Sequence, residues 1–154
     1  GGSTEITFYE NGKLKYKHSF NIGTIRLLNN LVTEEHWKEM KEEIKNKIVS
    51  KKKVVAIGSG GNINKLFSMS KTKEGKAIST ASLKKFLKET EPLSVEERMV
   101  KYHLREDRAD VMVPALKIFT NVLLWGNIEH IFVPKISVAD GLIHNIYDRM
   151  KKKK

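Results

Sequence analysis

Two glycine-rich segments contain the residues of this sequence that are best suited to binding an anion. The first is GGST at residues 1–4, and the second is GSGG at residues 58–61, directly after an apolar run. Glycine in a turn lets backbone N–H groups approach an anion closely, and the N-terminus of a following helix adds a favourable dipole. Both segments are therefore candidates for phosphate-binding turns.

Each segment also has a simpler interpretation. A leading Gly-Gly-Ser at residues 1–3 is what a cloning scar often leaves behind. Residues 58–61 could form a strand-to-helix turn that needs glycine only for close packing. They also resemble half of a dinucleotide-binding fingerprint, but no acidic residue that ends a second strand follows about 20 residues later. On the residues alone, these alternatives stay open.

Other kinds of chemistry find little support in the sequence. There is no cysteine, which excludes disulfides, thiol catalysis and thiolate zinc sites. The five histidines are scattered, with no pair at ligand spacing on one helix face, so we expect no histidine-based metal site. No nucleophile elbow surrounds any serine. The positions of Trp37 and Trp125 fit core packing better than stacking on nucleic-acid bases.

Length and composition predict one water-soluble globular domain. The chain has 154 residues, of which 40% are hydrophobic and 31% charged. No apolar run approaches the roughly 20 residues of a membrane span, and the start does not resemble a signal peptide. Together with the absence of cysteine, this favours a cytoplasmic location and no membrane partner.

The formal net charge of +11 indicates attraction to polyanions such as nucleic acid, nucleotides or polyphosphate. Only five of the 29 basic residues are arginine, however. Arginine is the residue that favours specific phosphate recognition, whereas lysine acts as a diffuse point charge. Much of the lysine could equally be the solvated face of exposed helices, and residues 151–154 are expected to be a basic tail.

The first half of the chain predicts a hairpin followed by helices and a buried strand. Residues 4–10 and 13–21 alternate in polarity around Asn11-Gly12, the strongest short signal for a hairpin turn. Helices are expected from Gly23 or Thr24, and from Thr33 as N-cap to about Val49. The apolar run at 54–57 predicts a strand that leads through the glycine turn into a helix at 62–70.

The second half predicts mainly helices. Residues 70–79 are expected to be a loop, Ser79 to cap a helix to about Lys88, and Ser94 with Glu97 to form a capping box. A long apolar helix is expected at 108–125, with Asp107 as its cap, Gly126 as its stop, and a kink or a late start at Pro114. A strand at 130–134 and a helix at 138–151 complete the chain.

This order of elements predicts an α/β fold. Strands separated by helices return in parallel through right-handed crossovers. We therefore expect one mixed sheet, in which the hairpin strands are antiparallel and the two later strands parallel, covered by helices.

Several segments, taken in order, resemble the exopolyphosphatase / guanosine pentaphosphate phosphatase family. They are GGSTE before a hairpin, SFNIGTIRL, VVAIGSGGNINKL, DRADVMVPALKIF and ISVADGLI. The resemblance covers the second, C-terminal domain of that family and implies a ribonuclease-H-like (actin-like ATPase) fold for residues 1–150. GGSTE and RADVMVP are its most specific parts. The chain departs from the family where a threonine is usual near Asn62, and in the closing helix, where an arginine-containing segment is usual.

The resemblance implies roles for individual residues. Residues 1–5 are similar to the end of the family's second phosphate loop, with Glu5 as the acid that helps to organise metal and water. We therefore expect Glu5 to be catalytic and to contact Mg²⁺. For Arg26, a contact with a polyanion and a structural ion pair are equal alternatives. The phosphate-facing residues expected on this basis are Gly1, Gly2, Ser3, Thr4, Gly60, Gly61 and Arg26.

The same resemblance implies that part of the catalytic machinery lies outside this chain. The family's first phosphate loop and the glutamate that activates water belong to an N-terminal domain, and a strand with an aspartate precedes the second loop. We expect this fragment to be inactive alone and its substrate to be polyphosphate or guanosine penta- or tetraphosphate. Two other classes stay open: a basic nucleic-acid-binding module, and an interaction domain that forms a homodimer through the apolar helix at 108–125.

Overall fold

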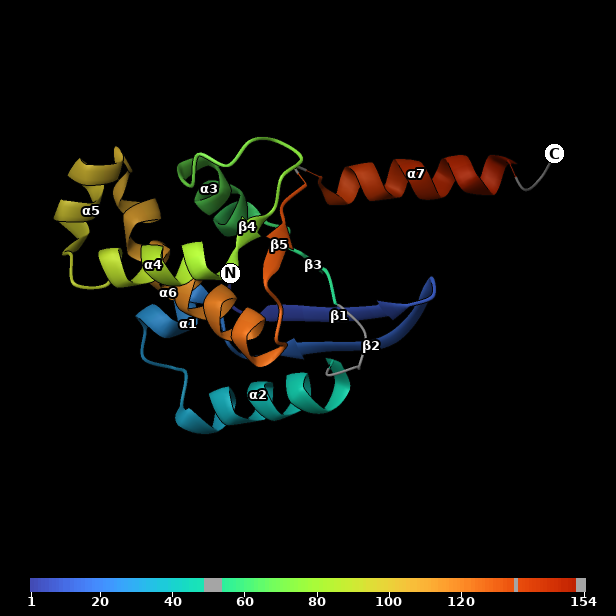
Figure 1. Ribbon diagram of the computed structural model, residues 1–154, viewed down its shortest axis with the longest axis horizontal. Coiled ribbons are helices and arrows are strands. Elements are labelled where there is room, and N and C mark those ends of the chain that lie inside the picture. The colour runs from blue at the N-terminus through green and yellow to red at the C-terminus, as the bar shows by residue number, and fades with distance from the viewer. Residues whose placement is uncertain (49–53, 135, 152–154) are drawn as a thin grey trace.

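The chain folds into a hairpin, a second small sheet and seven helices in the part that the structure, a computed structural model, describes: residues 1–48, 54–134 and 136–151 (Figure 1). The strands are β1 (Thr4–Glu10), β2 (Lys13–Phe20), β3 (Ala56–Ile57), β4 (Ile78–Ser79) and β5 (His130–Phe132). The helices are α1 (Thr24–Leu28), α2 (Glu34–Ile48), α3 (Gly61–Met69), α4 (Thr80–Thr90), α5 (Val95–Tyr102), α6 (Glu106–Trp125) and α7 (Val138–Lys151).

Strands β1 and β2 form the predicted antiparallel hairpin. Its turn residues Asn11 and Gly12 have positive φ angles of 51° and 72°, as an Asn-Gly turn predicts. One face of the hairpin carries Ile6 and Phe20, which are buried in a cluster with residues of α2. The opposite face, which includes Glu5, is exposed.

The second sheet has the strand order β3-β5-β4. Strand β3 is parallel to β5, as predicted, and β4 is antiparallel to β5. The prediction of a loop throughout residues 70–79 was wrong at its end, because Ile78 and Ser79 form β4. Two residues are too few to show the alternation of polarity that identifies a strand.

The prediction of a single mixed sheet was also wrong. Among the described residues β1 pairs only with β2, and β3 pairs only with β5, so no hydrogen-bonded ladder joins the two sheets. Polarity patterns identify strands but not their pairing partners. The broader prediction of an α/β fold with helices around small sheets is confirmed.

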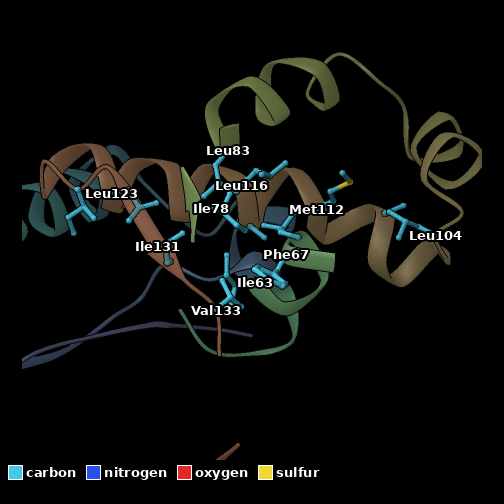
Figure 2. Close-up of a cluster of buried hydrophobic side chains, with 14 residues drawn as sticks. Ile63, Phe67, Ile78, Leu83, Leu104, Met112, Leu116, Leu123, Ile131 and Val133 are labelled. Atoms are coloured by element: carbon cyan, nitrogen blue, oxygen red, sulfur yellow. The ribbon is translucent and has the colours of Figure 1, made fainter. Parts of the chain in front are cut away.

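Two hydrophobic clusters stabilise the fold, and α6 contributes to both. The larger cluster joins α3, α4, α6 and β5, and Figure 2 shows Ile63 and Phe67 of α3 close to Leu116 of α6. The smaller cluster joins the hairpin and α2 to Ile118 of α6. Trp37 and Trp125 pack against this smaller cluster with their rings edge to face, 6.0 Å apart, which confirms their predicted role in packing.

Most predicted helix ends are confirmed. Ser79 caps α4, and Ser94 and Glu97 form the complete capping box of α5. Helix α6 stops at Gly126 as expected, but it begins at Glu106 rather than after Asp107, and Pro114 does not delay its start. Pro114 is buried, so packing of its ring offsets the hydrogen bond that proline removes.

Two predictions fall partly outside the described residues. These are the end of α2 at Val49 and the basic tail beyond Lys151. Within the described ranges, no helix combines the length and the apolar character that crossing a bilayer requires.

Candidate functional site

The glycine-rich segment at residues 1–3 packs directly on the start of α1. A Cβ atom added to Gly23 would lie 2.3 Å from the carbonyl oxygen of Gly1 and 2.7 Å from the nitrogen of Ser3. Because the atoms in the way belong to the backbone, only glycine allows the two segments to approach so closely. The carbonyl of Gly1 also accepts a hydrogen bond from the Ile25 amide at 3.4 Å. Gly23 thus holds the first loop against α1.

Thr24 connects the two glycine-rich segments. Its hydroxyl oxygen accepts hydrogen bonds from the N-terminal ammonium of Gly1 at 3.2 Å and from Asn62 Nδ2 at 3.5 Å. Thr24 is only 3% exposed. Asn62 follows Gly60 and Gly61, so residues 1–3 and 60–62 lie on either side of one buried hydroxyl although they are far apart in the sequence. The structure therefore brings together both turns that the sequence singled out.

The glycines of the second turn leave the N-terminus of α3 open. Gly60 is the N-cap and has a φ angle of 114°, in the region that favours glycine. Gly60 and Gly61 are both exposed. The first backbone N–H groups of α3 have no partners within the helix, which makes them available to an anion.

Glu5 lies at the start of β1, on the exposed face of the hairpin. Its Oε1 atom accepts hydrogen bonds from Ser3 Oγ at 3.3 Å and from Ser19 Oγ on the neighbouring strand. The two hydroxyls orient the carboxylate without burying it. Glu5 is therefore positioned beside the first loop and accessible to a cation.

Two arginine side chains lie beside the glycines. Arg26 Nε would be 4.0 Å from a Cβ on Gly2, and Arg108 Nη1 would be 3.6 Å from a Cβ on Gly61. Arg26 forms no ion pair with any residue that the structure describes, whereas Arg108 Nε lies 3.8 Å from Asp107 Oδ2. Contact between Arg26 and a polyanion stays a prediction.

The predicted phosphate-facing residues differ in what their side chains can offer. Ser3 is exposed, and its hydroxyl contacts Glu5. The Thr4 hydroxyl instead donates to the carbonyl of Ile22 at 2.6 Å, and Thr4 is paired with Phe20 in the hairpin, so this residue stabilises the fold. Gly1 and Gly2 are exposed beside Ser3.

Four residues of this region were not predicted as site residues. They are Gly23, Thr24, Asn62 and Arg108. Gly23 and Thr24 are part of the IGTIRL segment and Arg108 is part of RADVMVP, so the motifs contained the signal. Arg108, Asn62 and Lys65 also line a shallow pocket between α3 and α6 whose floor is apolar. Only the folded structure shows that these residues converge on the two turns.

Comparison with known protein families shows which family this sequence matches. Residues 1–150 match the sequence profile of the Ppx/GppA phosphatase family. The chain belongs to this family. The family is one of phosphatases. No curated protein matches the sequence significantly.

Solved Ppx/GppA structures share the fold. The type II variant of the Aquifex aeolicus Ppx/GppA phosphatase superimposes with a TM-score of 0.74 at 22% identity, covering 93% of this chain and 53% of the other. A second Aquifex aeolicus structure of the family gives 0.71 at 23% identity, covering 100% and 55%. An exopolyphosphatase from Cytophaga hutchinsonii gives 0.69 at 20% identity, covering 96% and 55%. The chain thus spans about half the length of these proteins.

The donor atoms near the first glycine loop show whether a divalent metal could bind there. Mg²⁺ retains several waters and is bound through one or two carboxylates together with phosphate oxygens. Glu5 offers one exposed, oriented carboxylate beside the first glycine loop. Among the described residues no three acidic or histidine side chains gather into a metal-binding group. The donor set therefore fits one protein ligand of a Mg²⁺ ion whose other ligands are phosphate and water.

Proposed function

We propose that this chain is the C-terminal half of a phosphatase that removes the terminal phosphate of inorganic polyphosphate or of guanosine pentaphosphate. The observation that carries the proposal is the junction at Thr24, which places two glycine turns on either side of one hydroxyl. Membership of the Ppx/GppA family over residues 1–150 supports the same reaction class.

In this proposal the chain binds and orients the phosphate. Backbone N–H groups of Gly2, Ser3 and the turn at 60–61 would donate to phosphate oxygens, and Arg26 and Arg108 lie close enough to these turns to offset negative charge. Phosphoryl transfer depends chiefly on such positioning and charge stabilisation. The cluster of backbone donors and arginines suits a ligand with several adjacent phosphates.

Glu5 has the role of metal ligand and catalytic carboxylate. Ser3 and Ser19 hold its side chain in one orientation, and this oriented carboxylate would hold a Mg²⁺ ion beside the phosphate. A bound Mg²⁺ would neutralise charge on the phosphate oxygens. Glu5 would also orient water on the same side of the ligand.

A second half of the enzyme completes the site. Hydrolysis also requires a group that activates the attacking water, and we assign it to the N-terminal domain that the family resemblance implies. We therefore expect the 154-residue chain alone to release no phosphate from either substrate. The absence of cysteine fits a cytoplasmic enzyme, which we also propose.

The test is phosphate release by the full-length protein that contains this chain, with Mg²⁺ present. We expect Glu5→Gln to lower kcat by about 100- to 1000-fold, because the oriented charge is lost while the hydrogen bonds are largely kept. Glu10→Gln, at the other end of the same strand, is the matched control and should retain full activity. Equal activity of Glu5→Gln and wild type would remove Glu5 from the mechanism. A wild-type protein that hydrolyses neither substrate would overturn the proposed function.

A further inference from the structure

Glu5 of β1 and Ser19 of β2 are direct cross-strand partners in the hairpin. Side chains of directly opposite residues point to the same face of a sheet, with Cβ atoms about 4.5–5.5 Å apart. The other face of the hairpin carries Ile6 and Phe20, which are buried with residues of α2, and Figure 1 shows α2 alongside the two strands. Glu5 and Ser19 therefore share the exposed face, where the hydroxyl can reach the carboxylate.

A β-bulge decides which residue lies opposite Glu5. The pairing register of the hairpin shifts by one residue between Phe8 and Tyr9. Continued without this shift, the pairing at the turn end of the hairpin would place His18 opposite Glu5. Bulges are common next to active sites, where they change the direction of a side chain. Here the bulge brings a hydroxyl, rather than an imidazole, to the carboxylate of Glu5.

The two oxygens of the Glu5 carboxylate have different surroundings. Ser3 Oγ, at 3.3 Å, and Ser19 Oγ both donate to Oε1. Oε2 accepts no hydrogen bond from any residue that the structure describes. Each carboxylate oxygen has about two lone-pair sites, so two donors occupy those of Oε1. Oε2 is therefore the oxygen that stays available to a cation.

Ser19 is the more firmly placed of the two donors. It belongs to β2, which pairs with β1 from Thr4 to Glu10. Ser3 precedes β1 and lies in the glycine loop that contacts phosphate in the proposed function. The Ser3 hydroxyl can turn towards a phosphate oxygen, whereas the ladder keeps Ser19 opposite Glu5. Ser19 is thus the residue that can hold the carboxylate while a phosphate is bound.

We propose that Ser19 is a positioning residue that occupies Oε1 of Glu5 and so restricts a divalent cation to a contact with Oε2 alone. This rests on the role of Glu5 as a metal ligand in the proposed function. A contact through one oxygen suits the octahedral coordination of Mg²⁺ and Mn²⁺. Ca²⁺ takes about six to eight oxygens and can use both oxygens of one carboxylate. The arrangement therefore favours the smaller cations over Ca²⁺.

The test is Mn²⁺ binding to the full-length protein in the absence of phosphate, measured from the EPR signal of free Mn²⁺. We expect Ser19→Ala to raise the Kd by about tenfold or more, as is usual when a residue that orients a metal ligand is removed. Ser19→Thr keeps the hydroxyl and should restore most of the lost affinity. The matched control, Thr7→Val, removes an exposed hydroxyl two residues from Glu5 in β1 and should leave the Kd unchanged.

Competition with Ca²⁺ distinguishes positioning from a loss of structure. In Ser19→Ala the Oε1 atom loses a donor and becomes available to the cation, so the ratio of the Ca²⁺ Kd to the Mn²⁺ Kd should fall severalfold. A destabilised hairpin would instead weaken the binding of both cations equally. An unchanged ratio would therefore overturn the proposal.

A double-mutant cycle assigns the effect to the carboxylate. Ser19→Ala should cause no further loss of Mn²⁺ affinity in a protein that already carries Glu5→Gln. The proposal would be overturned by a full additional loss in that background, by an equal loss in Thr7→Val, or by an unchanged Kd in Ser19→Ala. Phosphate release is measured separately. A protein that binds Mn²⁺ as expected but hydrolyses neither substrate would refute the proposed function and leave the role of Ser19 intact.

Discussion

The side-chain amide of Asn62 donates to the hydroxyl oxygen of Thr24 across 3.5 Å, and this contact joins the N-terminus of α3 to the N-terminus of α1. The same oxygen accepts from Gly1. One buried threonine thus sets the spacing between the two glycine turns. The candidate site depends on this junction more directly than on either turn alone.

Replacing Thr24 by valine should weaken phosphate binding. The substitution conserves shape but removes the hydroxyl that accepts from Asn62, and the loss of such a hydrogen bond costs about 0.5–1.5 kcal/mol. We expect a lower urea midpoint and a several-fold higher Kd for polyphosphate, measured by calorimetry on the full-length protein. Thr7→Val, at an exposed position of β1, serves as the control and should change neither value. Unchanged stability and affinity in Thr24→Val would show that the junction is dispensable.

Gly23→Ala should displace the first loop. The new methyl group would meet backbone atoms at 2.3–2.7 Å, and such overpacking costs about 1–3 kcal/mol or more. Urea unfolding should show the loss. Gly141→Ala is the comparison, because a Cβ there has open space inside a helix and should be neutral or stabilising. If both variants unfold at the wild-type midpoint, the close approach of residues 1–3 to α1 is incorrect.

A titration followed by amide NMR distinguishes a phosphate site from a nucleic-acid-binding surface. Polyphosphate should shift the amides of residues 2–5 and 58–62, whereas duplex DNA should perturb lysines diffusely and lose its effect by about 200 mM salt. Affinity of the chain alone is expected to be about millimolar, because half of the contacts are missing. Silent turn amides, combined with salt-resistant binding to one nucleic-acid sequence, would favour the nucleic-acid alternative.

Acid should destabilise the start of α7. Hydrogen bonds from the Ser137 hydroxyl and amide hold the pKa of Asp140 below its ordinary value of about 3.9. A carboxyl whose pKa is depressed by folding stabilises the folded state above the unfolded pKa and loses that effect as pH falls through the folded one. Amide shifts of residues 137–141 between pH 5 and 2 should report this loss. The response should vanish in Asp140→Asn and persist in Asp148→Asn; the same response in all three proteins would exclude Asp140 as its cause.

Features that depend on neighbouring residues were predictable from the sequence. The Asn11-Gly12 turn and the capping box of Ser94 and Glu97 are encoded within a few positions, and both were confirmed. The separation of the hairpin from the second sheet was not predictable, because nothing in the sequence of β1 and β2 shows that they pair only with each other among the described strands. Local patterns contain no information about such partners.

The same distinction applies to the candidate site. Its two turns could be recognised from their runs of glycine, and the family resemblance predicted that Glu5 belongs to the site. The part played by Thr24 was hidden, since its contacts with Gly1 and Asn62 span 23 and 38 positions. Arg108 belongs to the RADVMVP motif, but only folding shows that α6 places it beside Gly61.

Helix α6 lies between the two hydrophobic clusters, with Leu116 in one and Ile118 in the other. Loosening either cluster therefore destabilises the other, although no strand ladder joins the two sheets in the described part of the chain. The described part of the chain should melt as one cooperative unit, without a stable intermediate that retains only the hairpin. Most faces of α6 are therefore buried. As the sequence changes during evolution, few positions along this helix can accept a polar residue without loss of stability.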